Sequence, residues 1–72
     1  MKTEDQMYGV TPVVLWQHQR RGHEALQLEM AGDYVDAARA WQYTANRAPC
    51  PQWRRFARER ARYCREKPDS GR

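Results

Sequence analysis

Arginine is the residue type whose number and spacing most clearly suggest chemistry in this chain. Residues 49–66 contain six arginines and two glutamates, so this segment alone carries a net charge of +4, equal to the formal charge of the whole chain. Guanidinium groups bind phosphates and carboxylates through paired hydrogen bonds. The segment therefore predicts a surface that binds a polyanion or an acidic protein. The candidate partner-binding or nucleic-acid-binding residues are Arg54, Arg55, Arg58, Arg62 and Arg65.

Three uses of this basic segment remain open. Outward-facing Asn, Gln or Ser side chains that could read bases are almost absent, apart from Gln52, so any DNA contact is expected to involve mostly the backbone. Carboxylates on a protein partner would pair with the same guanidinium groups, and we favour a protein partner. The third possibility is a solvated face that only maintains solubility.

Other reactive side chains do not form a recognisable site. Cys50, Cys64, His18 and His23 lack the close ligand spacing of a zinc site. Cys64 is interpreted as a small packed hydrophobe, whereas Cys50, between two prolines, is expected to be exposed. The chain has no glycine-rich phosphate loop and no nucleophile elbow. We therefore predict no catalytic residue, cofactor or metal, and a protein that is not an enzyme.

The elements that must position the arginines are three helices. Their expected ranges are residues 12–31, 35–47 and 51–66, which gives an all-α three-helix domain over residues 11–66. Thr11 is the expected N-cap, and Gly32 provides the helix exit. Residues 1–10 are predicted to form a mobile N-terminal arm, and residues 67–72 a polar tail. Gly22 could break or kink the first helix, which would leave residues 13–16 as a short separate element, helix or strand.

Apolar residues at spacings of three and four define the expected core. Trp41 and Tyr63 are expected to pack in it, and Trp16 is weighed between core and partner anchor, with a lean toward core. Glu29 is the predicted ion-pair partner of Arg60, because a partly buried arginine needs a counter-charge. The inward stripe of the second helix is Tyr34, Ala37, Ala38 and Trp41, and that of the third is Trp53, Phe56, Ala57, Arg60 and Cys64.

The first two helices resemble a tetratricopeptide (TPR) unit. The matching positions are Gly32, Tyr34, Ala37, Trp41 and Pro49. Repeat arrays need about three such units to be stable, and this chain has one. The resemblance therefore describes a TPR-like helical hairpin and not a repeat protein.

A longer resemblance spans residues 25–64. The ordered pattern of Glu29, Gly32, Tyr34, Ala37, Ala38, Trp41, Trp53, Arg60 and Cys64 is similar to that of the PerC-like transcriptional activators and the related ANR (AraC negative regulator) family. The resemblance implies a small bacterial regulator, often encoded on prophages, plasmids or acquired islands. Some members activate virulence promoters, and others act on AraC-type activators or nucleoid silencing through protein contact.

Partners and location follow as expectations. We expect a cytoplasmic protein, since no apolar run is long enough to span a membrane and the first residues do not look like a secretory signal. The expected partner is a transcription regulator or a nucleoid-associated protein, with DNA contact possible. The core is thin for a self-sufficient domain, so a monomer and a homodimer both remain open. The alternative function is a helical-hairpin adaptor that binds a peptide, a phage protein or a secretion protein.

Overall fold

Local signals in the sequence set the boundaries of three helices in the computed structural model, which describes residues 10–68. These are α2 (Pro12–Met30), α3 (Tyr34–Asn46) and α4 (Pro51–Arg65), and residues 10–68 contain no strand. The predicted all-α three-helix domain is thereby confirmed. The predicted arm lies outside the described residues apart from residue 10, and the predicted tail apart from residues 67 and 68.

Caps and prolines explain where the helices begin and end. The Thr11 hydroxyl accepts a hydrogen bond from the Val14 amide at 3.1 Å, and proline occupies the first position of α2. At the other end of α2, Gly32 has a φ of 84°, in the left-handed region. The Gly32 amide bonds the Glu29 carbonyl, and the next amide bonds the Leu28 carbonyl, which is the Schellman arrangement.

The break considered at Gly22 does not occur, because α2 is continuous over 19 residues. The separate element considered for residues 13–16, helix or strand, is therefore also wrong. A Cβ atom added at Gly22 would lie 3.9 Å from Cζ3 of Trp41, so this part of α2 faces the Trp41 ring with room for one methyl group. Packing of α2 on α3 offsets the cost of a glycine inside a helix, about 1 kcal/mol.

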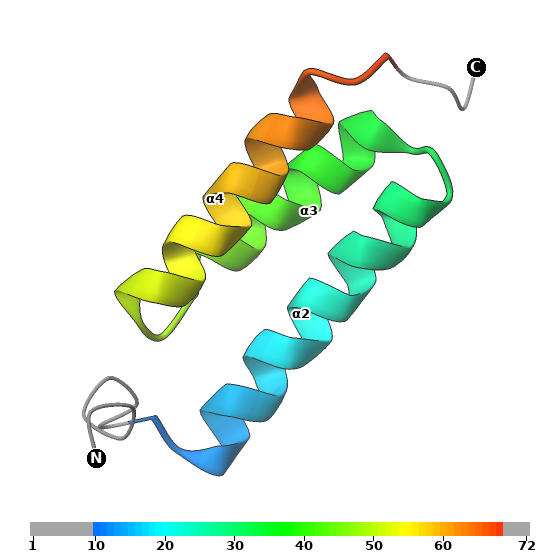
Figure 1. Cartoon of the computed structure of the whole chain (residues 1–72). Coiled ribbons are helices and arrows are strands. Elements are labelled where there is room, and N and C mark those ends of the chain that lie inside the picture. Colours follow the sequence, from blue (N-terminus) through cyan, green and yellow to red (C-terminus); the bar gives the residue numbers. More distant parts are fainter. Residues whose placement is uncertain (1–9, 69–72) are drawn as a thin grey trace.

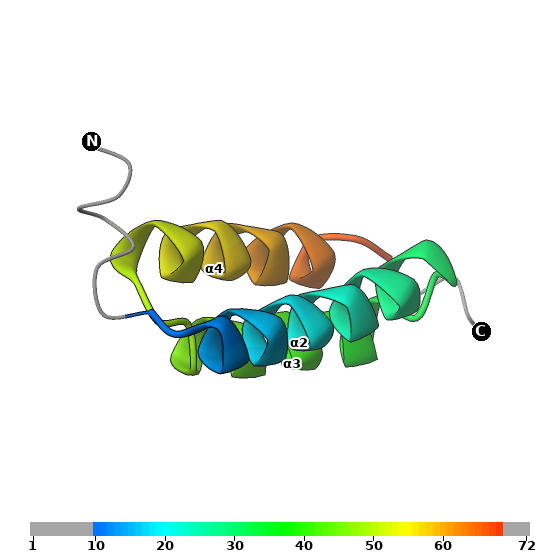
Figure 2. The ribbon, with the colours of Figure 1, turned by 90° about the horizontal axis from the view of Figure 1, so that it is seen from below.

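α3 is the central helix of the three. It packs against both α2 and α4, whereas α2 and α4 approach each other at only a few points. Figure 1 shows α2 and α3 as a helical hairpin with α4 returning beside α3, and Figure 2 shows the same helices from below. The α3–α4 turn and the start of α2 lie at one end of the domain (Figure 1). Consequently each outer helix buries only a narrow arc of its surface.

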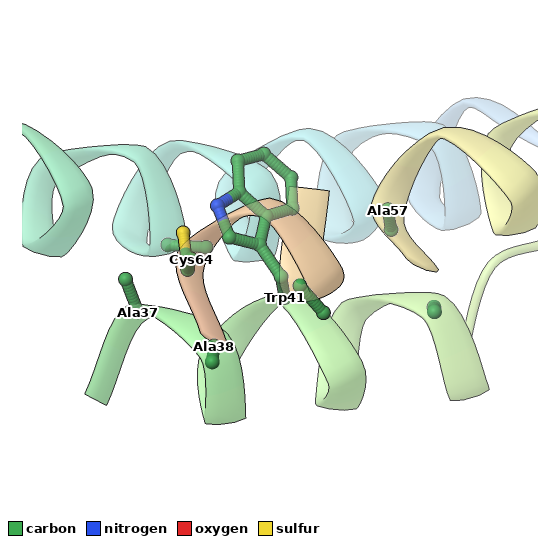
Figure 3. Close-up of a cluster of buried hydrophobic side chains, with 8 residues drawn as sticks. Ala37, Ala38, Trp41, Ala57 and Cys64 are labelled. Atoms are coloured by element: carbon green, nitrogen blue, oxygen red, sulfur yellow. The ribbon is translucent and has the colours of Figure 1, made fainter. Parts of the chain in front are cut away.

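The core consists of one large ring surrounded by small side chains. Trp41 is buried on α3, and Figure 3 shows its ring among small side chains that include Ala57 and Cys64 of α4. Small residues at these positions let the helix backbones approach closely. The other buried apolar residues of this cluster are Ala25, Ala37, Ala38, Ala45 and Ala61, with Tyr34 and Leu28 packed at its edge.

Several predictions about burial were wrong. Phe56 is 58 % exposed and Tyr63 is also exposed, because the buried arc of α4 is the narrower row of Ala57, Ala61 and Cys64. Trp16 is 57 % exposed, near the start of α2. Cys50, expected at the surface, is only 4 % exposed and occupies the N-cap position of α4.

Candidate functional site: the arginine flank of α4

The two sides of α4 differ in chemistry. At 3.6 residues per turn, all five predicted binding arginines fall within about 100° of arc on one side of the buried row. The aromatic residues Trp53, Phe56 and Tyr63 fall on the opposite side, toward α2. We call the first side the arginine flank. Its members are Arg54, Arg55, Arg58, Arg62 and Arg65, and all five are exposed.

The arginine flank lies beside α3 and forms a shallow trough with it. One hollow of about 430 Å³ is lined by four of the flank arginines, Glu59 of α4 and Gln42 of α3. The four arginines are spaced at three and four residues, so their side chains form a row parallel to the axis of α4. The structure thus brings together Arg55, Arg58, Arg62 and Arg65.

Few carboxylates oppose these charges. Glu66 forms an ion pair with Arg62, with 3.5 Å between Nε of the arginine and Oε2 of the glutamate, and both side chains are mostly exposed. An exposed pair of this kind contributes at most about 1 kcal/mol and is easily exchanged for another partner. Glu59 is the other acidic residue at the trough. The flank therefore retains a positive surface that can bind an anionic group.

Arg60 has a structural role that separates it from the flank. Its Nη2 atom donates to Oε2 of Glu29, so the predicted ion pair is present. The other carboxylate oxygen of Glu29 accepts from the Trp41 indole N–H at 3.0 Å. Glu29 is nearly buried and thus joins all three helices through one carboxylate. The guanidinium of Arg60 also lies 4.5 Å from the centre of the Tyr63 ring, in cation–π geometry.

Residues of the family-like pattern thus mainly form the scaffold. Glu29, Trp41 and Arg60 are bonded to one another, and Gly32 forms the turn between α2 and α3. Ala37, Ala38 and Cys64 are buried around Trp41, and Tyr34 packs at the edge of the same cluster. Trp53 is half-buried and stacks on His18.

An aromatic groove occupies the other side of α4. It has a volume of about 390 Å³ and runs between α2 and α4, with Trp41 at its floor. Phe56 lines it and meets the Trp41 ring edge-on, with ring centres 5.8 Å apart. Its walls from α2 include Gly22 and Leu26. This groove is predominantly apolar, unlike the arginine flank.

His18 is one of the residues that line the aromatic groove. Its ring stacks on Trp53 with centres 4.8 Å apart, and its buried Nδ1 atom has no hydrogen-bond partner among the described residues. Burial, with a smaller contribution from the Arg21 charge, lowers the pKa of His18 below its ordinary value of 6.5. The ring is therefore neutral at neutral pH and packs as an aromatic side chain.

The two thiols are structural. Burial raises the pKa of the Cys64 thiol, although Arg60 and Lys67 act in the opposite direction. Both cysteines are free and buried. Within residues 10–68, no cluster of three or more His, Cys, Asp or Glu side chains could hold a metal ion.

Sequence reasoning missed the contribution of α3 to the trough. From the sequence, Arg39 and Gln42 are polar residues within the second expected helix, and Val35 is its first residue. All three line a second hollow beside the arginine flank. Helical periodicity could have placed Arg39 and Gln42 on one side of α3, but only the packing of α4 against that side shows that they face the arginines.

Comparison with known proteins gives no relatives for this chain: no protein-family model, no curated protein and no solved structure matches it. A separate finding concerns membranes. None of the helices within residues 10–68 is both long and apolar enough to cross a bilayer.

Proposed function

We propose that this protein is a small, non-enzymatic bacterial regulator of transcription of the PerC-like or ANR-like kind, which acts through contact with another regulator or a nucleoid-associated protein. The arginine flank of α4 is the contact surface. The observation that carries this proposal is the concentration of five exposed arginines on one side of one helix, next to α3. Non-specific contact with the DNA backbone through the same arginines is a secondary activity.

The scaffold adds support to the resemblance. Glu29, Trp41 and Arg60 occupy positions of the family-like pattern that are far apart in the sequence, and their side chains are bonded in the structure. Residues whose side chains bond to one another in a single cluster have a physical reason to occur together in a sequence. The exposed arginines then lie on a helix that this cluster holds in place.

Transcript profiles of bacterial cells that express the chain test the proposed function. The wild-type protein is expected to change a defined set of transcripts, and the variant Arg54→Glu/Arg58→Glu/Arg62→Glu is expected to lose most of that change. The matched control is Arg20→Glu/Arg21→Glu/Arg47→Glu, which alters the net charge equally but leaves the arginine flank intact. The control should keep the wild-type profile, provided that both variants have the helix content of the wild type by circular dichroism.

Two outcomes would contradict the proposal. An unchanged profile with the wild-type protein would remove the role in transcription. Equal loss of the response in the flank variant and the control would show that the response depends on the net charge of the protein and not on the position of the flank arginines.

A second candidate function is a helical-hairpin adaptor that binds a peptide, a phage protein or a secretion protein. The aromatic groove favours it, because apolar grooves between helices are suited to binding an amphipathic segment. Under this function, the transcript profile stays unchanged and both arginine variants retain binding.

A further inference from the structure

The trough beside the arginine flank continues into an apolar hollow. This hollow has a volume of about 440 Å³, and its lining includes Val35 and the small buried side chains Ala38 and Cys64. Three cationic residues, Arg39, Arg65 and Lys67, also line it. It is therefore an apolar depression framed by positive charge.

The apolar hollow and the arginine-lined hollow form one surface. They share two lining residues, Gln42 and Arg65, so a single elongated trough runs along the α3–α4 side of the domain. One end is apolar around Val35, and the other carries the row from Arg55 to Arg62. From residue 55 to residue 65, a helix extends about 15 Å.

We propose that this trough binds an acidic amphipathic segment of a protein partner, with one apolar side chain of that segment seated between Val35, Ala38 and Cys64. Carboxylates of the segment pair with Arg58, Arg62 and Arg65. This inference rests on the proposed function, since it names the chemistry of the protein that the arginine flank contacts.

The composition of the trough favours a protein over nucleic acid. A phosphate backbone offers negative charge but no apolar group that would fill a hollow whose floor is alanine and cysteine. An acidic helix offers both, because residues three and four apart lie on one face and a leucine can follow a row of glutamates. Charge complementarity thus favours a negatively charged partner, and the apolar hollow favours a protein over a nucleic acid.

Fluorescence anisotropy with synthetic probes tests this inference on the full chain. The main probe is a labelled helical peptide with a row of glutamates and one leucine at the end of the row. A second peptide has serine in place of the leucine, and a third probe is labelled duplex DNA. We expect the leucine peptide to bind about tenfold more tightly than the serine peptide, which corresponds to about 1.4 kcal/mol, and more tightly than the DNA at the same ionic strength.

Two valine variants locate the seat of the leucine. Val35→Asp puts a carboxylate at the edge of the hollow and is expected to abolish the difference between the leucine and serine peptides. Val13→Asp is the matched control, because Val13 and Val35 are both exposed and both occupy the second position of a helix. An aspartate is favourable at that position in either helix, so both variants should fold. Val13→Asp is expected to bind both peptides as the wild type does.

Equal binding of the leucine and serine peptides, or tighter binding of the DNA, would overturn the inference. These results are distinguishable from failure of the proposed function. If the flank variant loses its transcript response while both peptides bind alike, the proposed function stands without the apolar anchor. If the peptides behave as expected and no transcript changes, the trough is a peptide-binding surface and the proposed role in transcription is wrong.

Discussion

At the scale of single residues, Glu29 is the side chain that bonds to both of the other helices. It is nearly buried, and its two oxygens accept hydrogen bonds from Trp41 of α3 and Arg60 of α4. A buried carboxylate is costly unless both its charge and its lone pairs are satisfied. These bonds satisfy both and fix the positions of α3 and α4 relative to α2.

A double-mutant cycle between Glu29 and Arg60 measures this coupling. Glu29→Ala is expected to lower the free energy of unfolding by about 2–3 kcal/mol, because it leaves the Trp41 indole N–H and the Arg60 guanidinium without their acceptor. Arg60→Ala should also destabilise, and the coupling energy should be about 1 kcal/mol or more. Urea denaturation of the wild type, the single variants and the double variant gives these values. Additive losses in the double variant would show that the two side chains act independently.

At the scale of elements, the helix boundaries were predictable and the exposure of the helix sides was not. Thr11, Gly32 and Pro51 act through local backbone chemistry, so their effects can be read from neighbouring residues alone. Whether Phe56 is buried depends on whether another helix covers it. α2 approaches α4 at only a few points, and Phe56 lines the open groove between them. The same reason explains why the trough was missed, because it requires two helices to be placed side by side.

Two glycine-to-alanine substitutions test the roles of Gly22 inside α2 and of Gly32 in the turn that follows it. Gly22→Ala is expected to raise the free energy of unfolding by about 0.5–1 kcal/mol, because alanine favours the helix interior and the new methyl group meets Trp41 at an ordinary contact distance. Gly32→Ala is expected to lower it by about 1–2 kcal/mol, because Gly32 has a left-handed conformation. Thermal or urea denaturation measures both. A loss of stability in both variants would mean that the contact between α2 and Trp41 has no room for a methyl group at residue 22.

At the scale of the whole molecule, α4 separates two surfaces of different chemistry. The arginine flank and its trough face one way, and the aromatic groove opens between α4 and α2. The sequence predicted the candidate binding arginines because their charge is concentrated in one segment. It could not show that they share one side with Arg39 and Val35, since that arrangement comes from the packing of α4 on α3. The proposed binding surface is thus the trough and not the aromatic groove.

Nuclear magnetic resonance of the nitrogen-labelled chain tests this claim most directly, since it reports binding residue by residue. The chain is titrated with the acidic leucine peptide, and the shifts of backbone amides and arginine side chains are followed. We predict the largest changes at Val35, Arg58, Arg62 and Arg65, with little change in the aromatic groove. Changes concentrated at Gly22, Leu26 and Phe56 would instead assign binding to the aromatic groove and rule out the trough.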